Sequence, residues 1–196
     1  MVTVRSRGRL PHWEAQRATY FVTFRLADAL PASVLESFEL QRENILATTD
    51  RDGGDVSRYK RDKLRELFGG LIDRHLDAGT GSCHLARPEI AGIVAEALEH
   101  FDGDRYRVFA WCVMPNHVHV VFAPHPGWPL ADILHSWKSF SASRANRMLG
   151  RTGPFWQREY YDHLVRDGQD FDRVVQYVLD NPEKAGLVDW RWVGSA

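Results

Sequence analysis

The sequence has only two cysteines, Cys83 and Cys112, and neither belongs to a CxxC pair. A disulfide framework and a cysteine zinc site are therefore not indicated, and a reducing compartment fits. Long apolar runs are also missing: the run Val108–Met114 is far shorter than the roughly 20 residues that a membrane helix needs. The N-terminal segment has no apolar signal core. We expect a cytoplasmic protein with no membrane partner.

The chain also lacks a net charge of either sign, because 25 basic residues balance 26 acidic ones. Whole-chain charge therefore gives no argument for a nucleic-acid partner. Positive charge is local instead. Residues 1–25 hold five arginines against Glu14, and residues 131–166 hold six basic residues against three acidic ones.

What the chain does have is the length and composition of one soluble domain. Its 196 residues are 44% apolar and 12% aromatic, and one core of this size buries about 70% of the surface exposed by the unfolded chain. Alternating and helical spacings of apolar residues predict the order of its elements. In chain order we expect a strand at 19–26, helices near 34–46, 64–76 and 90–101, a hairpin around residues 114–116, a helix at 130–149, a strand near 158–167 and a helix at 170–181.

This order predicts an α+β fold with the ferredoxin-like βαββαβ antiparallel sheet and an extra C-terminal helix. We expect a single domain, residues 1–196, with a helical insertion in the first crossover at about residues 31–87. The polar stretch 48–62 inside it is typical of a mobile loop. A separate small helical domain is the alternative, but no linker of proline or serine flanks the region.

Two histidines, His117 and His119, lie two residues apart on a predicted strand, so both imidazoles project from one face and can meet one divalent ion. The spacing alone is also compatible with two core histidines. Apolar residues flank the pair, and two buried rings need polar partners, which a shared metal would supply.

On the last predicted helix, Tyr177 and Asn181 are four residues apart and therefore share a face. Asn181 precedes Pro182, which we expect to end the helix and leave the amide free to face outward. By spacing alone, the asparagine could be a helix cap and the tyrosine a residue at the rim of the core.

The combination of "MPNHVH" at 114–119 with "YVLDNPEKAGLV" at 177–188 resembles the REP-associated tyrosine transposases, a branch of the single-tyrosine HUH transposases. The similarity starts at "YFVTFRLADALP", skips residues 31–87 and covers roughly two thirds of the chain. The resemblance implies the ferredoxin-like fold, a divalent metal (Mg²⁺ or Mn²⁺) held by His117, His119 and Asn181, and Tyr177 as the nucleophile. It also implies a nucleoid-associated monomer or homodimer that cuts single-stranded or hairpin DNA through a 5′-phosphotyrosine intermediate.

For DNA contact we favour basic residues of the 130–149 helix and of the segment that follows it, because phosphates are held mainly by lysine and arginine. These are Lys138, Arg144, Arg147, Arg151 and Arg158. A solvated helix face is the alternative.

Aromatic and N-terminal residues give two further possibilities. Trp137 and Trp156 could stack on unpaired bases, although both also suit core positions. Arg5, Arg7 and Arg9 could form a flexible basic arm, or only a tail.

Two other functions stay open from the sequence: a DNA-hairpin-binding protein that does not cut, and an HxH metallohydrolase that uses activated water. Trapping a covalent protein–DNA species would separate them from the transposase. The hairpin sequence, the cleavage position and whether the Tyr177 helix serves its own or a neighbouring subunit do not follow from the sequence.

Overall fold

The computed structural model describes residues 2–6, 11–15, 18–47 and 58–195, and the chain divides into two compact units. The first unit comprises residues 1–27 and 83–196, and the second comprises residues 28–82. Each unit is described by itself.

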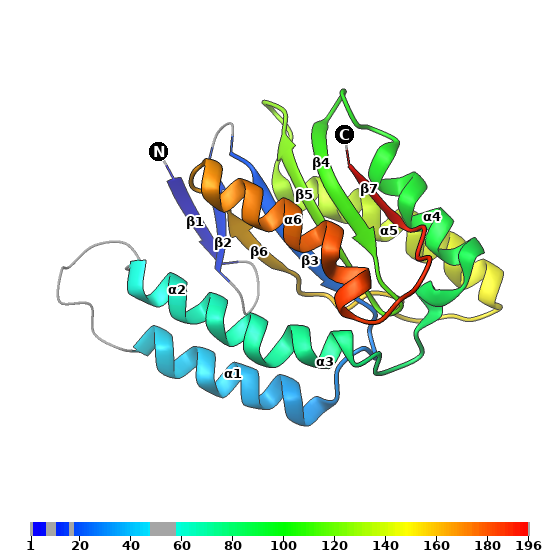
Figure 1. Cartoon of the computed structure of the whole chain (residues 1–196), viewed down its shortest axis with the longest axis horizontal. Helices are drawn as coiled ribbons and strands as arrows, with labels where there is room; N and C mark the ends of the chain where they lie inside the picture. Colours follow the sequence, from blue (N-terminus) through cyan, green and yellow to red (C-terminus); the bar gives the residue numbers. More distant parts are fainter. Residues whose placement is uncertain (1, 7–10, 16–17, 48–57, 196) are drawn as a thin grey trace. The chain divides into compact units, whose positions relative to one another are not determined.

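A five-stranded antiparallel sheet forms the centre of the first unit, with the spatial order β6-β3-β5-β4-β7 (Figure 1). Its strands are β3 (Tyr20–Arg25), β4 (Tyr106–Val113), β5 (His117–Pro124), β6 (Tyr161–Leu164) and β7 (Val193–Ser195). The four strands β3, β4, β5 and β6 lie in the order β6-β3-β5-β4. This is the ferredoxin-like arrangement, which confirms the predicted fold. The edge strand β7 was not predicted.

Helices cover both faces of this sheet. They are α4 (Pro88–Glu99), α5 (Leu130–Leu149) and α6 (Gly168–Lys184), preceded by a short 3₁₀ turn η2 (His84–Ala86). On one face, Val174 and Val178 of α6 pack against Phe21 and Val121 of the sheet. On the other face, the Trp137 ring of α5 packs against aromatic rings of β4 and β5. None of the helices in the described part of the chain combines the length and apolarity needed to cross a membrane.

The helix α6 does not stop before Pro182, contrary to our expectation, but continues to Lys184. Proline removes only its own N–H from the helical ladder, and here it does so in the last turn, where little helix remains to be disrupted. The Ala185 N–H still donates to the Asn181 carbonyl at 3.0 Å. Asn181 is therefore a residue of the helix, 2% exposed, and its amide does not face outward as predicted.

The N-terminal segment forms a two-stranded antiparallel hairpin from β1 (Val2–Ser6) and β2 (Pro11–Ala15). Arg5 pairs with His12 in this ladder. The expected flexible arm is therefore wrong for Arg5, because backbone pairing holds it in a strand. Arg7 and Arg9 lie outside the described residues.

The second unit is helical, as predicted for the insertion. It contains α1 (Ala32–Ala47), α2 (Arg58–Leu67), a π-helical segment η1 (Phe68–Asp73) and α3 (Arg74–Asp77). We expected a polar loop at 48–62, but α2 starts at Arg58, so residues 58–62 are helical. Residues 48–57 lie outside the described part. The compact unit 28–82 has nearly the bounds that we expected for the insertion, and its status as an elaboration of a single domain stays a prediction.

Candidate active site

The histidine pair lies on β5, which β3 and β4 flank on its two sides (Figure 1). His117 and His119 are both fully buried, and their rings project from the face that α6 covers. Their Nε2 atoms are 3.0 Å apart. The two-residue spacing thus brings both rings to one point, as the strand geometry requires.

The other ring nitrogen of each histidine, Nδ1, lies next to a polar side chain. The Asn116 Oδ1 lies 2.7 Å from the His117 Nδ1, and because a carbonyl oxygen only accepts, this nitrogen carries the proton. The Nε2 of His117 therefore presents a lone pair. The Thr23 Oγ1 lies 2.7 Å from the His119 Nδ1, and a hydroxyl can donate or accept there. His119 can consequently present either a lone pair or an N–H at Nε2.

Both imidazoles are neutral at physiological pH. Burial lowers the pKa of His119 to about 3. Burial also lowers the pKa of His117 well below its ordinary value, and a proton on His119 or the positive charge of Arg25 disfavours its protonation further. Neutral imidazole is the form that binds metal ions.

Tyr177 and Asn181 come from α6. The Tyr177 ring centroid lies 5.3 Å from that of His119 and 5.7 Å from that of Phe21. Tyr177 is half-buried, whereas both histidines and Asn181 are buried, so a nucleic acid reaches the tyrosine most directly. Asn181 lies one turn further along the same helix face. Its Oδ1 is buried and has no hydrogen-bond partner among the described residues.

These donors fit a divalent metal ion. In octahedral coordination with bonds of about 2.1 Å, two neighbouring ligands are about 3 Å apart, which is the spacing of the two Nε2 atoms. The Asn181 Oδ1 is a buried acceptor that lacks a donor, and amide oxygens are ligands of hard cations. No group of three or more His, Cys, Asp or Glu side chains that could hold a metal ion occurs in the described residues.

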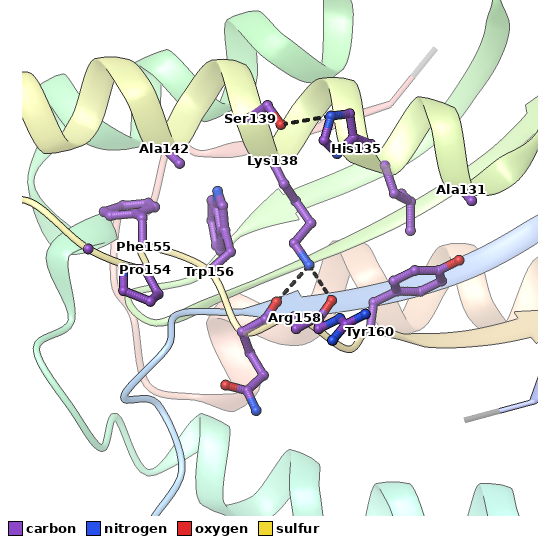
Figure 2. Close-up of a pocket in the computed structure, with 13 residues that line it drawn as sticks. Ala131, His135, Lys138, Ser139, Ala142, Pro154, Phe155, Trp156, Arg158 and Tyr160 are labelled. Carbon is purple, nitrogen blue, oxygen red and sulfur yellow. Dashed lines mark hydrogen bonds between the residues drawn. The ribbon is translucent and has the colours of Figure 1, made fainter. Parts of the chain in front are cut away.

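The basic residues that we favoured for DNA contact have different environments. The Lys138 amine donates to the carbonyls of Gln157 and Arg158 at 2.6 and 2.8 Å (Figure 2). Arg144 forms an ion pair with Glu96, and Arg151 donates to the Pro154 carbonyl. These three side chains thus already have protein partners. Arg147 and Arg158 are exposed.

A groove of about 420 Å³ lies between α5 and the segment 153–160. Lys138, Arg158, His135 and Tyr160 line it, together with apolar residues (Figure 2). Two of the five basic residues are therefore brought together here, while Arg144, Arg147 and Arg151 do not line this groove.

Both tryptophans are core residues, as the alternative interpretation held. Trp137 is 2% exposed and its N–H donates to the Tyr106 hydroxyl, while Trp156 is 6% exposed and its N–H donates to Ser141. Trp137 lies inside the core and does not line the groove, whereas Trp156, although buried, is one of the residues that line it.

Three site residues were missed by the sequence reasoning: Thr23, Arg25 and Asn116. Phe21, Thr23 and Arg25 lie on one face of β3, and polar residues on the buried face of a strand need partners. This pattern in the sequence could have pointed to Thr23 and Arg25 as site residues. Asn116 follows the turn proline and carried no comparable signal.

The histidine pair on β5 and the tyrosine on α6 lie within one segment of the chain that is similar to a known protein family. Residues 86–181, which hold the histidine pair on β5 and both Tyr177 and Asn181 on α6, match the family model described as "Transposase IS200 like". The resemblance inferred from the two motifs is thereby confirmed.

Named relatives agree with this family. The chain is 27% identical over 89 residues to the REP-associated tyrosine transposase of Escherichia coli, covering 43% of this chain and 52% of that protein. A protein of Haemophilus influenzae that is predicted to be of the same kind is 24% identical over 111 residues, covering 52% of this chain and 61% of its own length. The matches thus span less than two thirds of either relative.

A solved structure of a REP-associated tyrosine transposase bound to a REP hairpin is also similar to this chain. It is 17% identical, covers 96% of this chain and 82% of that chain, and superposes with a TM-score of 0.48.

Proposed function

We propose that this protein is a metal-dependent single-stranded DNA endonuclease and strand transferase that cuts hairpin-associated DNA through a 5′-phosphotyrosine intermediate on Tyr177. The family supports a transposase role in DNA processing. The observation that carries the finer proposal is the packing of the Tyr177 ring, 5.3 Å between centroids, on the ring of His119. The proposed nucleophile, Tyr177, thus lies against one ring of the histidine pair, that of His119, across the interface between α6 and the sheet.

In the proposed reaction the Tyr177 oxygen attacks the scissile phosphorus in line with the bond to the 3′ oxygen. The new bond joins the tyrosine oxygen to phosphorus, and the bond between phosphorus and the 3′ oxygen breaks. The phenol loses one proton and the departing 3′ oxygen gains one, so charge is conserved. The reverse attack by a 3′ hydroxyl releases Tyr177 and joins DNA, which makes strand transfer possible without another energy source.

His117, His119 and Asn181 would hold a divalent ion, Mg²⁺ or Mn²⁺. When bound, such an ion orients the phosphate and offsets the negative charge that develops during the displacement. Asn116 accepts a hydrogen bond from the protonated Nδ1 of His117. The Nε2 of His117 therefore keeps its lone pair for a metal ion. Because two neutral imidazoles and an amide contribute no negative charge, the site does not repel phosphate.

Single-stranded or hairpin DNA is the proposed partner, and nucleoid association follows from that substrate. The named relatives are REP-associated tyrosine transposases, and a solved structure of a protein of that description contains a bound REP hairpin. On this chain the groove between α5 and residues 153–160 offers Arg158 to the phosphate backbone and the Tyr160 ring to an unpaired base. The proposed oligomeric state is a monomer or a homodimer.

The decisive experiment is a search for the covalent adduct. Wild-type protein is incubated with Mn²⁺ and single-stranded hairpins from the DNA that flanks its own gene, and the adduct is mapped by mass spectrometry. We expect the nucleotide on Tyr177. Tyr177→Phe should fold and bind DNA but form no adduct, because only the hydroxyl is lost. Tyr160→Phe is the matched control and should still form it.

Other outcomes would replace the proposal. Cleavage by Tyr177→Phe would favour the water-using hydrolase, and tight hairpin binding without any cleavage by the wild-type protein would favour the non-cutting binding protein.

Metal dependence is tested separately. His117→Ala and His119→Ala should each abolish cleavage and Mn²⁺ binding, measured by isothermal titration, while the circular dichroism spectrum stays native. Full cleavage by either variant, or in excess chelator, would contradict the metal assignment.

A further inference from the structure

Arg25 lies next to the histidine pair without belonging to it. It ends β3 and is the direct cross-strand partner of His117, just as Thr23 is the partner of His119 (β3 and β5 in Figure 1). Thr23 contacts the His119 ring, so its side chain is on the active-site face. Side chains two residues apart on a strand share a face, and Arg25 is therefore on this face beside His117.

A further observation supports this position. The strand end is fixed, because the Gln157 N–H donates to the Arg25 carbonyl at 2.9 Å and Leu26 pairs with Trp156.

The guanidinium of Arg25 is buried but lacks a partner. Arg25 is 6% exposed, and within the described part of the chain its side chain forms no hydrogen bond or ion pair. Burial lowers the pKa of Arg25 to about 10, so the group remains charged at neutral pH. A buried charge is ordinarily paired, because removing it from water is expensive. An unpaired guanidinium at the edge of the proposed phosphate-processing site is therefore well placed to bind an anion.

Glu159 offsets part of this charge. Its carboxylate raises the pKa of Arg25, although the two groups do not form an ion pair within 4.0 Å. One oxygen of Glu159, Oε2, is itself buried without a hydrogen-bond partner among the described residues. Glu159 thus stabilises the buried guanidinium at a distance and leaves its five N–H donors available.

We propose that Arg25 is a further catalytic residue, whose guanidinium donates to a non-bridging oxygen of the scissile phosphate beside His117. The assignment rests on the proposed function and adds a protein-borne cation to the site. A planar guanidinium binds two phosphate oxygens at once, and a preorganised donor stabilises the charge that grows on them as the phosphoryl group is transferred.

The neighbouring cation Lys184 suits this role less well. Its amine lies 5.9 Å from the Tyr177 ring centroid, but the side chain is 58% exposed and pairs with Asp180. Water and Asp180 therefore screen its charge, whereas Arg25 is only 6% exposed and forms no ion pair within the described part of the chain.

The test compares Arg25→Gln, Arg25→Lys and a control, Arg107→Gln, which changes an exposed arginine of β4. Two quantities are measured on each folded variant: the single-turnover rate of adduct formation with saturating hairpin DNA, and the affinity for Mn²⁺ in the absence of DNA. We expect Arg25→Gln to slow adduct formation about 10² to 10³-fold, the range for loss of one preorganised donor. Arg25→Lys should lose less, because it keeps the charge but not the two-pronged geometry. Arg107→Gln should match the wild type.

The Mn²⁺ affinity separates catalysis from support of the site. Arg25→Gln should bind Mn²⁺ at least as tightly as the wild type, because a positive charge beside His117 has been removed. A parallel fall in Mn²⁺ affinity and rate would make Arg25 a structural support for His117 and overturn the assignment. If Arg25→Gln does not fold, a wild-type rate in Arg25→Lys would likewise overturn it.

Failure of the proposed function can be told apart from failure of this inference. A wild-type protein that forms no adduct would overturn both, whereas a wild-type adduct with an equal rate in Arg25→Gln would overturn the role of Arg25 alone.

Discussion

The neutral state of His117 and His119 links the candidate site to stability. Each ring is fully buried and has a lowered pKa, mainly because burial disfavours the charged form. In the unfolded chain an imidazole takes up a proton below pH about 6.5. The folded protein then binds fewer protons than the unfolded chain, and the balance shifts toward unfolding.

We therefore predict that the metal-free protein loses stability on mild acidification. The contribution of the pair is fully present above pH about 6.5 and is lost as pH falls toward the folded pKa, which for His119 is about 3. The free energy of unfolding should fall by up to about 1.4 kcal/mol per pH unit per histidine. Urea unfolding with chelator at pH 7.5, 6 and 5 measures this slope.

Two variants check the origin of the acid sensitivity. His119→Asn should reduce the slope by about half, and His135→Gln, which changes an exposed histidine of α5, should leave it unchanged. An unchanged slope in His119→Asn would assign the effect to other groups. Asp170 does not contribute in this range: burial alone would raise its pKa, but Arg173 and His163 lower it below its ordinary value. Its titration therefore affects stability only in stronger acid.

At the scale of elements, Lys138 connects α5 to the segment that precedes β6. Its amine donates to the Gln157 and Arg158 carbonyls. Burial lowers the pKa of Lys138 to about 8, and the charge of Arg25 contributes. We expected this residue to contact DNA, which stays a prediction; in the structure its amine is bonded to two backbone carbonyls in the wall of the groove.

We predict that Lys138→Met lowers the free energy of unfolding by about 1 to 3 kcal/mol, because two carbonyls lose a charged donor while the penalty for burying the amine is relieved. Chemical denaturation measures the change. Lys184→Met removes an exposed pair four residues apart on α6 and should change stability by only a few tenths of a kcal/mol. Equal effects of the two substitutions would show that the carbonyl contacts of Lys138 are not stabilising.

At the scale of the whole molecule, charge is balanced but unevenly placed. The formal net charge is −1, so the DNA binding that we propose requires local positive surface. The described groove with Arg158 and Tyr160 is such a surface in the first unit. The second unit, residues 28–82, lies outside the residues that match the transposase family.

We predict tighter binding to a hairpin with a single-stranded tail than to a blunt duplex of equal length, because only an unpaired base can stack on Tyr160. Fluorescence anisotropy at several salt concentrations measures this preference. Affinity should fall as salt rises, and Arg158→Gln should make the slope of log affinity against log salt shallower by about 1. Arg107→Gln is the control and should leave the slope unchanged. Equal affinity for hairpin and duplex at matched salt would contradict the prediction.

Local patterns were enough to predict much of this protein. Period-two alternation placed the strand at Tyr20–Arg25, and helical spacing with a terminal glycine placed the helix at Leu130–Leu149, where Gly150 adopts the left-handed conformation. The spacing of His117 and His119 placed two rings on one face. These features depend on neighbours within a few residues, and the chain alone therefore determines them.

Tertiary structure decided what the local patterns could not. Thr23 meets His119 across 96 residues of sequence, and Arg25 is beside His117 only because β3 pairs with β5 in one register. The helix α6 continues past Pro182 to Lys184, because Asn181 and Pro182 are buried in its last turn. The missing backbone N–H of the proline costs little there. Strand register and burial depend on the packing of distant segments, and no periodicity of the sequence encodes them directly.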